Sequence, residues 1–566
     1  MQARIVAGRL PEQVDLDAVL QPSLSLIAPP DQLIDADRAI ARLGQAVVYG
    51  ERIGILTDYD ADGLTSHAVI KTALLRYGVP EGLISSWIGH RLEDGYGISE
   101  TLVDRLLANE SMPEIVISAD CGSSDHATIA RLAEAGITVI VTDHHQVPAD
   151  GPPPAAYAVV NPNRVDCTYP DGAIAGVMVC WLVMSGLRSW LIQQAFLAEA
   201  TPKLGDLLDY VALGTVADCV SLGTSAINRA VVQAGLRKMR LLDRPTWRVT
   251  LGQLGLNAER LDAETLAFQI APRLNARGRI AHSERGLSYL MAHHEQEALA
   301  AYLDLDADNN TRRVIEAEMT ASAKPRAARL REQGARTLIV VLESGHAGVQ
   351  GIVASRLVEA FGRPVVVLTP ATDPNQFSGS MRSIPDVDAK AVLDRIAEHS
   401  DAGLIRYGGH PGAAGLTLDR GAIGAFADHM QATMLADHPD ILGEPVKWVD
   451  GSLLPEQLTL VTVDAIAELG PFGRGFESPL FEGTFEVRST RLVGKDNRHL
   501  ALQLRMDDVE CEAIWFGAVE AGQRPVQVGD WIQAGYRLQA NNFRGRRLSL
   551  VIQTAWSLTT NGMGMA

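Results

Sequence analysis

Short apolar runs alternate with amphipathic stretches from about Ala46 to Val220. Four of these runs are rich in β-branched residues and are separated by segments with helical periodicity: Arg52–Thr57, Glu114–Ser118, Thr138–Thr142 and Tyr157–Val160. Strands that alternate with helices predict a parallel sheet with helices on its faces. Each of the first three strands leads into an acidic or histidine cluster, and such sheets bind ligands at the carboxyl ends of their strands. We therefore expect these clusters to meet at one edge of the sheet.

The hydrophobic pattern changes again beyond this region. From Asp206 to about Ser322 it is chiefly helical, and Glu295–Lys324 predicts a long connecting helix that Pro325 interrupts. A second alternation of strands and helices then leads to a glycine-rich loop near Gly408. Its strands are predicted at Arg336–Leu342 and Pro364–Leu368. From Val446 onward short strands dominate, as in a small OB-type barrel: Gly483–Val487, Leu500–Leu504, Glu512–Phe516 and Arg547–Ile552.

The predicted fold class is therefore α/β with several domains, since 566 residues exceed what one hydrophobic core usually spans. We expect a parallel-sheet domain, a long connecting helix, a second α/β domain and a C-terminal OB-type β-barrel. The predicted boundaries are an N-terminal segment 1–45, a first α/β domain 46–220, a helical part with the connecting helix 221–335, a second α/β domain 336–445 and a barrel 446–566.

Composition narrows the class of protein. With 47% apolar and 21% charged residues the chain is typical of a globular protein, and its net charge of -18 argues against a protein that coats nucleic acid non-specifically. Any nucleic-acid path must be locally basic. No continuous apolar stretch stands in residues 1–28, so we expect neither a signal peptide nor a membrane span and predict a cytoplasmic protein. Five cysteines without CxxC spacing predict reduced, mostly buried thiols.

The strongest local motif follows the first predicted strand. In Thr57–Gly63 three carboxylates, Asp58, Asp60 and Asp62, stand at two-residue spacing, and in an extended backbone they would project to the same side. Crowded carboxylates are costly to ionise unless a divalent cation binds them. An acidic turn or a helix cap is the equally simple alternative. An EF-hand is excluded because the twelfth loop position carries no glutamate.

Three more polar clusters follow in order. Asp120 ends the second of the predicted strands, Asp143-His144-His145 follows the third, and Asp218 is a lone carboxylate in an apolar stretch. A helix N-cap is an alternative for Asp120, whereas adjacent histidines beside an aspartate are uncommon as turn residues. Oxygen-rich ligands with imidazoles and no thiolate pair favour Mn²⁺ or Mg²⁺ over structural zinc.

These residues resemble, in order and setting, the four motifs of the DHH-family phosphoesterases. Further segments extend the resemblance to the RecJ type, which has DHH, DHHA1 and OB domains: Arg91–Gly97, Pro272–Arg279, Gly348–Arg356, Gly379–Ser383 and Gly408–Gly415. The ordered combination is far more specific than any single motif. Two residues depart from the pattern: Gly345 stands where a tryptophan is expected before His346, and Arg277 where a small residue is expected.

The resemblance implies a single-strand-specific DNA exonuclease that works 5′ to 3′ and releases 5′-mononucleotides with two Mn²⁺ or Mg²⁺ ions. It implies that Asp60, Asp62, Asp120, His144 and Asp218 are ligands, and that Asp58 and His145 bind the metals directly or support those ligands. Asp143 is expected to orient a histidine or a water. The residues expected to act in catalysis are Asp120, His144, His145 and Arg279.

Arg279 is also a candidate to neutralise the scissile phosphate, with a surface ion pair as the alternative. Ser380, Arg382, Ser383 and His410, with Arg91 as a weaker candidate, are expected to hold a 5′ phosphate. In the barrel, Phe543 could stack on bases, while Trp515 and Phe516 are expected in the core. Local positive charge there comes from Arg488, Arg491, Lys495, Arg498, Arg505 and the segment Phe543–Arg547.

Other functions stay open at this point. A DHH/DHHA1 phosphodiesterase for short oligonucleotides or cyclic dinucleotides, or a small-molecule pyrophosphatase, would not need the barrel. An inactive nucleic-acid-binding scaffold would not need to keep every ligand. No GxxxxGK[ST] loop occurs, so ATP-driven movement is not expected. The expected partners are single-stranded DNA and, by resemblance, single-strand-binding protein and a RecQ-type helicase, with a monomer and no membrane contact; no segment identifies a docking site.

Overall fold

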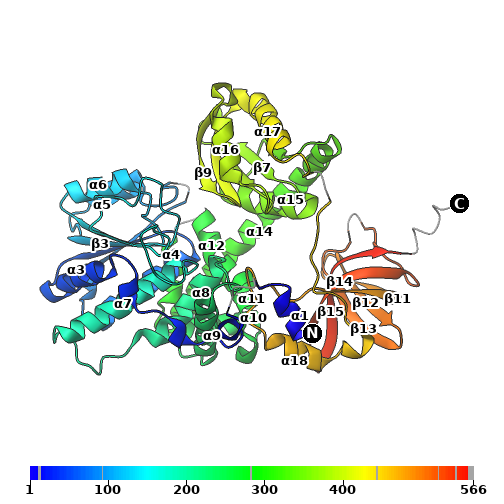
Figure 1. Ribbon diagram of the computed structural model, residues 1–566, viewed down its shortest axis with the longest axis horizontal. Helices are drawn as coiled ribbons and strands as arrows, with labels where there is room; N and C mark the ends of the chain where they lie inside the picture. Colours follow the sequence, from blue (N-terminus) through cyan, green and yellow to red (C-terminus); the bar gives the residue numbers. More distant parts are fainter. Residues whose placement is uncertain are drawn as a thin grey trace.

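The described residues form three β-sheets, and each sheet packs against buried apolar residues of its own region. The computed structural model describes residues 1–10, 15–91, 93–280, 283–441, 444–519, 522–541 and 545–558. Figure 1 shows the first α/β domain at the left, the second above and the closed barrel at the right, with helices α12 and α14 running between them. The predicted α/β fold class with a C-terminal barrel is confirmed.

The first sheet is five-stranded and parallel, with the order β2-β1-β3-β4-β5. Its strands are β1 Ile53–Thr57, β2 Ile84–Ile88, β3 Ile115–Ala119, β4 Thr138–Thr142 and β5 Ala158–Val160. Strand β2 was not expected, because Ser85 and Ser86 break its apolar run. The serines fit an edge strand that is only partly buried.

Helices cover both faces of this sheet. On one face α3 Ala36–Tyr49, α4 Ala61–Arg76 and α7 Gly176–Gln193 contribute to the largest core, and on the other α5 Glu100–Leu107 and α6 His126–Glu134 form a smaller one. Helix α7 is long and apolar enough to cross a membrane, but 61% of that stretch is buried inside the protein. Its apolar composition is that of a core helix.

A helical part follows and ends in the connecting helix. Its helices are α8 Leu208–Ala217, α9 Ala226–Arg240, α10 Pro245–Leu254, α11 Ala263–Thr265, α12 Ala271–Ile280, α13 Glu284–Leu290 and α14 Glu295–Glu332. The predicted interruption at Pro325 is wrong, because α14 continues through it. An interior proline costs about 3 kcal/mol, but Ala323 and Ala327 on either side are buried against the second sheet, which holds the helix together.

The second sheet has the order β6-β7-β8-β10-β9, and only the β6–β7 pair is parallel. Its strands are β6 Leu338–Val341, β7 Val365–Pro370, β8 Gln376–Arg382, β9 Leu404–His410 and β10 Ala413–Asp419, with helices α15 Gln350–Phe361, α16 Ala389–Ala397 and α17 Ile423–Asp437. The glycine-rich loop predicted near Gly408 is wrong. Gly408 and Gly409 lie in β9 and pair with Gly415 and Ala414, and the chain turns only after His410.

The barrel closes in the order β11-β12-β13-β15-β14. Its strands are β11 Phe481–Val493, β12 His499–Met506, β13 Val509–Trp515, β14 Trp531–Asn541 and β15 Arg547–Ser557. Trp515 packs against the barrel core, but Phe516 is 61% exposed, so its predicted burial is wrong. Strand β13 ends at Trp515 and Phe516 begins a turn. Phe543 lies outside the described residues.

The N-terminal residues share the core of this barrel. Helix α1 Gln2–Ala7 carries the buried Ile5 and Val6, and these side chains pack with barrel residues in one cluster. Helices α2 Leu16–Leu20 and α18 Leu460–Ala467 complete this region. Arg229 is fully buried and donates to the backbone oxygens of Val19, Leu469 and Pro471. It thereby joins the N-terminus, the helical part and the segment before the barrel.

Candidate metal centre

The site is built where three neighbouring strands end. The register aligns Thr57 of β1 with Ala119 of β3 and Ala119 with Thr142 of β4. Each is the last residue of its strand, and each is followed by an aspartate, Asp58, Asp120 or Asp143. The parallel sheet therefore delivers three acidic segments to one edge.

The segment after β1 does not stay extended, so the expected projection of three carboxylates along one strand face is wrong. Helix α4 begins at Ala61, and Asp60 caps it: its Oδ1 accepts from the backbone N–H groups of Asp62 (3.0 Å) and Gly63 (3.1 Å). Asp58 is buried at the end of the strand, and Asp62 lies in the first helical turn. The early start of the helix, favoured by this cap, turns Asp62 toward β3 and β4.

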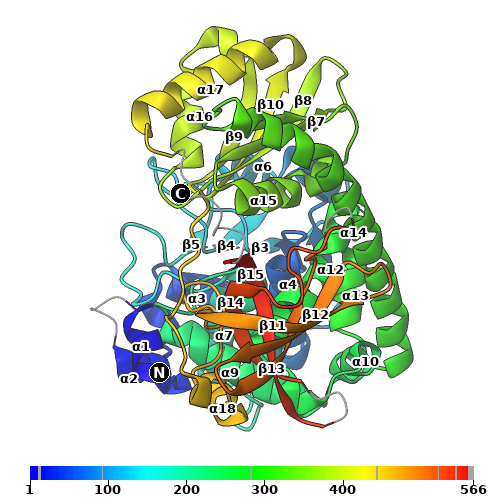
Figure 2. The same ribbon diagram turned by 90° about the vertical axis from the view of Figure 1, so that its right-hand side faces the viewer.

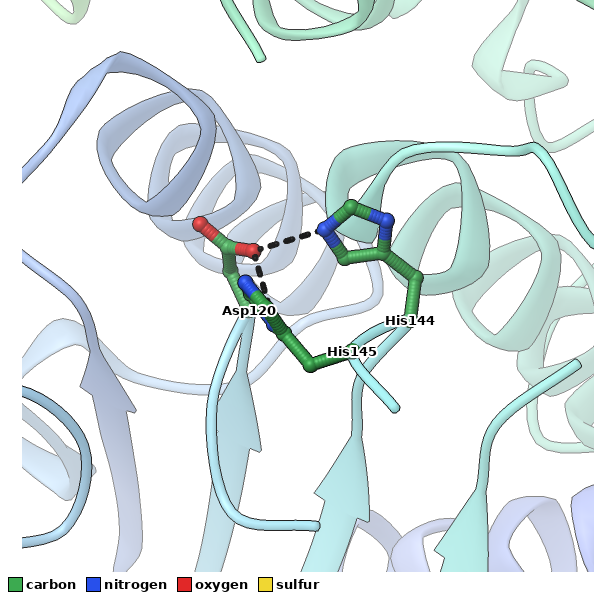
Figure 3. Close-up of side chains that lie close together, drawn as sticks. All are labelled: Asp120, His144 and His145. Carbon is green, nitrogen blue, oxygen red and sulfur yellow. Dashed lines mark ion pairs between the residues drawn. The ribbon is translucent and has the colours of Figure 1, made fainter. Parts of the chain in front are cut away.

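His144 lies at the middle of the site. Its Nε2 is 3.2 Å from Asp120 Oδ1, 3.5 Å from Asp218 Oδ2 and 3.9 Å from Asp62 Oδ2. Figure 3 shows the rings of His144 and His145 beside Asp120, at the ends of the strands. Two groups of three possible ligands result, Asp120 with both histidines and Asp62 with His144 and Asp218, each within 4.8 Å. His144 belongs to both groups, so the two groups overlap at one imidazole.

Among the described residues, two buried atoms of this site have no hydrogen-bond partner. They are Asp120 Oδ1 and His144 Nε2. A buried polar atom left unpaired costs about 1–3 kcal/mol, and Asp120 also has a left-handed backbone with φ 62°, which is uncommon for a residue other than glycine. A divalent cation would satisfy both atoms at once. The donor set therefore fits a metal.

The electrostatics of the site point the same way. Burial, and after it the charge of Asp60, raises the pKa of Asp62 to about 7. Burial and the surrounding carboxylates raise the pKa values of Asp120 and Asp218 well above their usual range, and burial does the same for Asp58. Burial lowers the pKa of His144 to about 4, which leaves it neutral and able to bind a metal near pH 7. Crowded carboxylates beside a neutral imidazole need a cation to ionise together.

His145 is held by Asp143. Its Nδ1 lies 2.8 Å from Asp143 Oδ1 and 3.8 Å from Asp120 Oδ1. Burial lowers the pKa of His145, but the hydrogen bond and charge of Asp143 outweigh burial and raise it to about 9. Burial likewise raises the pKa of Asp143, yet its bond to His145 brings it well below the usual range. Asp143 thus forms the hydrogen bond to a histidine that its predicted orienting role requires.

Helices α7 and α8 approach the carboxylates closely. Asp62 accepts from the N–H groups of Gly176 (2.8 Å) and Val177 (3.1 Å) at the start of α7. A Cβ on Gly176 would lie 3.0 Å from Asp120 Oδ1, and one on Gly214 of α8 would lie 2.6 Å from Asp62 Oδ1. Any side chain at these two positions would push into the site.

Several supporting residues were not singled out in the sequence. Asn161 Nδ2 donates to the backbone oxygen of His145 (2.9 Å), and Asn163 Nδ2 donates to that of His144 (2.5 Å). Asn275 Oδ1 accepts from Ala61 N–H (2.8 Å), and Tyr96 Oη lies 3.0 Å from the His145 ring. An Asn-Pro-Asn run directly after β5 was the available signal, because that strand ends beside the one that precedes the histidines.

Three arginines lie close to one another near Tyr59, the residue after Asp58, and we call them the arginine cluster: Arg91, Arg279 and Arg382. Arg279 Nη1 donates to Gly348 O (2.8 Å), and Arg382 Nη1 donates to Ser380 Oγ (2.9 Å). Burial and then Arg91 lower the pKa values of both, to about 10 for Arg279. None of the three pairs with a carboxylate among the described residues, so the surface ion pair considered for Arg279 does not form.

The second α/β domain reaches the centre through His410. Its ring stacks near that of His145, with 6.3 Å between the ring centroids. Ser383, by contrast, donates its hydroxyl to Val387 O (2.6 Å). The first and second α/β domains therefore lie close together at His145 and His410, two of the predicted site residues.

The two departures from the family pattern have local explanations. A Cβ on Gly345 would lie 2.9 Å from Thr369 Cγ2 and 3.0 Å from Met319 Cε, so this packing has no room for a side chain there. Arg277 pairs with Asp308 of α14 (2.5 Å) and helps to fix the connecting helix to α12. Neither residue contacts the predicted ligands.

A groove of about 1590 Å³ separates the helical part from the barrel. Phe268, 76% exposed, and Phe516 both line it. Among the cations predicted for the barrel, Arg488 and Arg505 both pair with Glu486. Arg491 lines the groove and has no ionic partner among the described residues.

Three family models match the chain in order. They are the DHH family N-terminal domain at residues 52–215, the DHHA1 domain at 334–435 and the RecJ OB domain at 449–554. Together they cover the two α/β domains and the barrel.

Curated relatives match nearly the full length. The single-stranded-DNA-specific exonuclease RecJ of Escherichia coli strain K12 is 35% identical over 559 residues, covering 95% of this chain and 93% of the relative. The protein of the same name from Dickeya dadantii is 36% identical over 538 residues, covering 92% and 90%.

Solved structures agree with these matches. The chain is similar to the crystal structure of RecJ in complex with Mn²⁺ from Thermus thermophilus, with a TM-score of 0.75, 28% identity and coverage of 95% of this chain and 73% of that one. The Mg²⁺ complex of that protein gives a TM-score of 0.69 at 26% identity, covering 94% and 71%.

Proposed function

The chain belongs to the RecJ family of single-stranded-DNA-specific exonucleases, and on this premise we propose how its residues divide the work. It is a metal-dependent exonuclease that acts on single-stranded DNA. The observation that carries the proposal is the convergence of three carboxylates and two imidazoles, in which two buried atoms, Asp120 Oδ1 and His144 Nε2, have no hydrogen-bond partner among the described residues. That arrangement is costly unless cations bind.

We assign the metal ligands to Asp62, Asp120, His144 and Asp218, with His145 beside them. Asp58 and Asp60 complete the acidic surroundings, and Asp60 raises the pKa values of Asp62, Asp120 and Asp218 through its charge. Two Mn²⁺ or Mg²⁺ ions bound here would polarise the phosphate and lower the pKa of a water for attack.

The chain's own groups position the substrate and manage its charge. Arg279 would bind the non-bridging oxygens of the scissile phosphate, because it belongs to α12 and is also bonded to the second α/β domain through Gly348 O. His145, kept protonated by Asp143, can donate a proton or a hydrogen bond at the departing oxygen. Asn161 and Asn163 keep the two histidine backbones in place.

The 5′ to 3′ polarity would come from the second α/β domain. Arg382, Ser380 and His410 of that domain, together with Arg91 of the first domain, would supply cationic and hydrogen-bonding groups for a terminal 5′ phosphate. A phosphate held there leaves the first internal linkage over the metals, and the product is a 5′-mononucleotide. Ser383 would contribute only if its hydroxyl leaves Val387 O.

Length preference would come from the barrel side. The groove beside Phe268 and Phe516 has exposed aromatic side chains that can stack on unpaired bases, which suits a longer strand. A DHH/DHHA1 phosphodiesterase for short oligonucleotides would make no use of this groove.

We propose a cytoplasmic monomer that acts on strands exposed by a RecQ-type helicase and presented by single-strand-binding protein, in DNA repair and recombination. One chain supplies every group named above. Its five cysteines are all free, as a reducing compartment favours.

The test uses 5′-labelled and 3′-labelled single strands, a duplex and a dinucleotide with Mn²⁺ or Mg²⁺. Stepwise release of mononucleotides from the 5′ end of the single strand alone is expected, and EDTA should abolish it. Cleavage of the dinucleotide with an untouched polymer would instead assign the chain to the phosphodiesterases of short substrates. Binding without cleavage would indicate a scaffold.

A further inference from the structure

A second group of metal-binding side chains lies on the second α/β domain, away from the catalytic edge. It consists of His399 and Asp401, at the short turn Ser400–Ala402 (η8) that precedes β9, and His429 of α17. Figures 1 and 2 both place α17 at the outer end of this domain, on the side opposite the first sheet. None of the three residues belongs to a motif that resembles the exonuclease family.

The three side chains already converge. His429 Nε2 lies 3.0 Å from Asp401 Oδ1, and the rings of His399 and His429 stack with 4.1 Å between their centroids. One possible ligand atom from each residue lies within 4.8 Å of the others. Ligands at about 2.0–2.2 Å from a tetrahedral zinc-like ion lie about 3.3–3.6 Å apart. The group therefore needs to contract by at most about 1.5 Å.

The backbone that carries these groups is fixed. His399 N–H donates to Ile396 O (3.0 Å), Ala402 N–H donates to His399 O (3.1 Å), and the Ala402 side chain is fully buried. Gly403 follows with φ 63°, and Asp419 N–H closes the turn by donating to its oxygen (2.9 Å). The turn therefore presents His399 and Asp401 to α17 without having to order itself on binding, which lowers the entropic cost.

We propose that His399, Asp401 and His429 bind one divalent transition-metal ion of the zinc class, separate from the catalytic ions. Two imidazoles and one carboxylate suit Zn²⁺, Co²⁺ or Ni²⁺, whereas Mg²⁺ prefers oxygen ligands alone. The stacked rings differ by only 14° in plane, so their in-plane lone pairs run nearly parallel. The exposed ring of His399 has to turn for both nitrogens to face one ion, and water fills the remaining positions. The ion would clamp the turn before β9 to α17.

The experiment counts zinc bound per chain after equilibrium dialysis of the full-length protein in excess Mg²⁺. The variants are His399→Gln, Asp401→Asn and His429→Gln, and the matched control is His438→Gln, which changes another histidine just beyond the same helix. Zinc that enters the catalytic centre is counted equally in every sample. We expect about one zinc ion fewer in each of the three variants than in the parent and the control.

A second readout is thermal unfolding. Zn²⁺ should raise the Tm of the parent and of His438→Gln more than that of the three variants, while all five proteins should have the same Tm in EDTA and the same exonuclease activity in Mg²⁺. Equal zinc counts in parent and variants would overturn the proposal, as would a deficit in the control as large as in the variants. If His429→Gln fails to fold, the exposed His399→Gln decides the outcome.

Discussion

The metal centre and the arginine cluster are two neighbouring regions of opposite charge: carboxylates crowd the first, and guanidinium groups crowd the second. At the metal centre the charged groups are short side chains fixed by the ends of three strands and by hydrogen bonds from α7. In the arginine cluster they are long side chains from the loop after β2, from α12 and from β8. Metal ions need ligands at fixed distances, whereas a phosphate that moves during the reaction needs charge that can follow it. We therefore expect substitutions in the metal centre to reduce metal binding, and substitutions in the arginine cluster to weaken the handling of phosphate without loss of metal.

The largest effect should come from the metal side. Asp120→Ala and His144→Ala each remove a ligand and leave the remaining carboxylates repelling one another, so activity should fall by more than about 10³-fold, beyond the 10²–10³ typical of one lost electrostatic donor. Mn²⁺ titration followed by calorimetry should show the loss of at least one bound ion.

The matched control is Asp104→Ala, which removes an exposed carboxylate that pairs with Arg131 on the same domain. It should leave both activity and metal binding unchanged. Full activity of His144→Ala would disprove the assignment of His144 as a metal ligand.

The arginine cluster should respond less strongly and with a different signature. Arg279→Ala and Arg382→Ala should lower kcat/KM by about 10²–10³-fold without changing the number of metal ions bound. For Arg382→Ala the advantage of a 5′-phosphorylated strand over a 5′-hydroxyl strand should disappear, because the variant lacks the guanidinium that would bind the terminal phosphate.

Arg285→Ala serves as the control, since Arg285 pairs with Asp304 on the outer side of α14. A wild-type preference for 5′-phosphate in the Arg382→Ala variant would place the terminal phosphate elsewhere. A loss of bound metal in Arg279→Ala would mean that the arginine cluster and the metal centre do not act independently.

A smaller effect is expected from removing a hydrogen bond that holds the backbone of a metal-binding histidine. Asn163→Ala removes the bond to the His144 backbone, and losses in the support of metal ligands typically cost about 10–100-fold in metal affinity or activity. Raising the Mn²⁺ concentration should restore most of the activity of this variant, unlike that of Asp120→Ala. Asn109→Ala, at an exposed turn, is the control. A defect that excess Mn²⁺ does not relieve would contradict a supporting role.

The smallest effect concerns pH and the metal-free protein. The folded state raises the pKa of Asp62 from 3.8 to about 7 and that of His145 from 6.5 to about 9. A raised pKa contributes stability that is complete below the unfolded value and is lost as pH rises through the folded value. His144, whose pKa is lowered to about 4, acts in the opposite direction, but only below 6.5.

Between pH 6.5 and 9 the protein in EDTA should therefore lose stability, by at most about 1.4 kcal/mol per pH unit for each group within its range. The Tm gained on adding Mn²⁺ should grow over the same interval, because deprotonated ligands bind the ion. Differential scanning fluorimetry across this range measures both. If the increase in Tm on adding Mn²⁺ instead becomes smaller as pH rises, the raised pKa of Asp62 is contradicted.

The preferences of local segments for strand or helix determine much of this architecture without any tertiary contact. Runs such as Thr138–Thr142 are strands because β-branched side chains fit a pleated, buried surface, and the alternation with helices requires parallel pairing. Parallel pairing then brings Asp58, Asp120 and Asp143 to one edge, which is why the metal centre could be predicted without a structure. The weakly apolar strand β2 escaped this reasoning because Ser85 and Ser86 carry no such pattern.

Tertiary contacts decided the rest. Pro325 stays inside α14 because Ala323 and Ala327 are buried against the second sheet, and Ile5 joins the barrel core although the barrel strands begin more than four hundred residues later in the sequence. Packing between separate elements also brings His410 close to His145 and places Asp218, at the end of α8, beside His144. The periodicity of apolar residues reports only the preference of a local segment for helix or strand, and it carries no information about contacts with distant segments. The sequence alone therefore identified the chemical groups and the edge where they gather, while packing over long distances determined which of them meet.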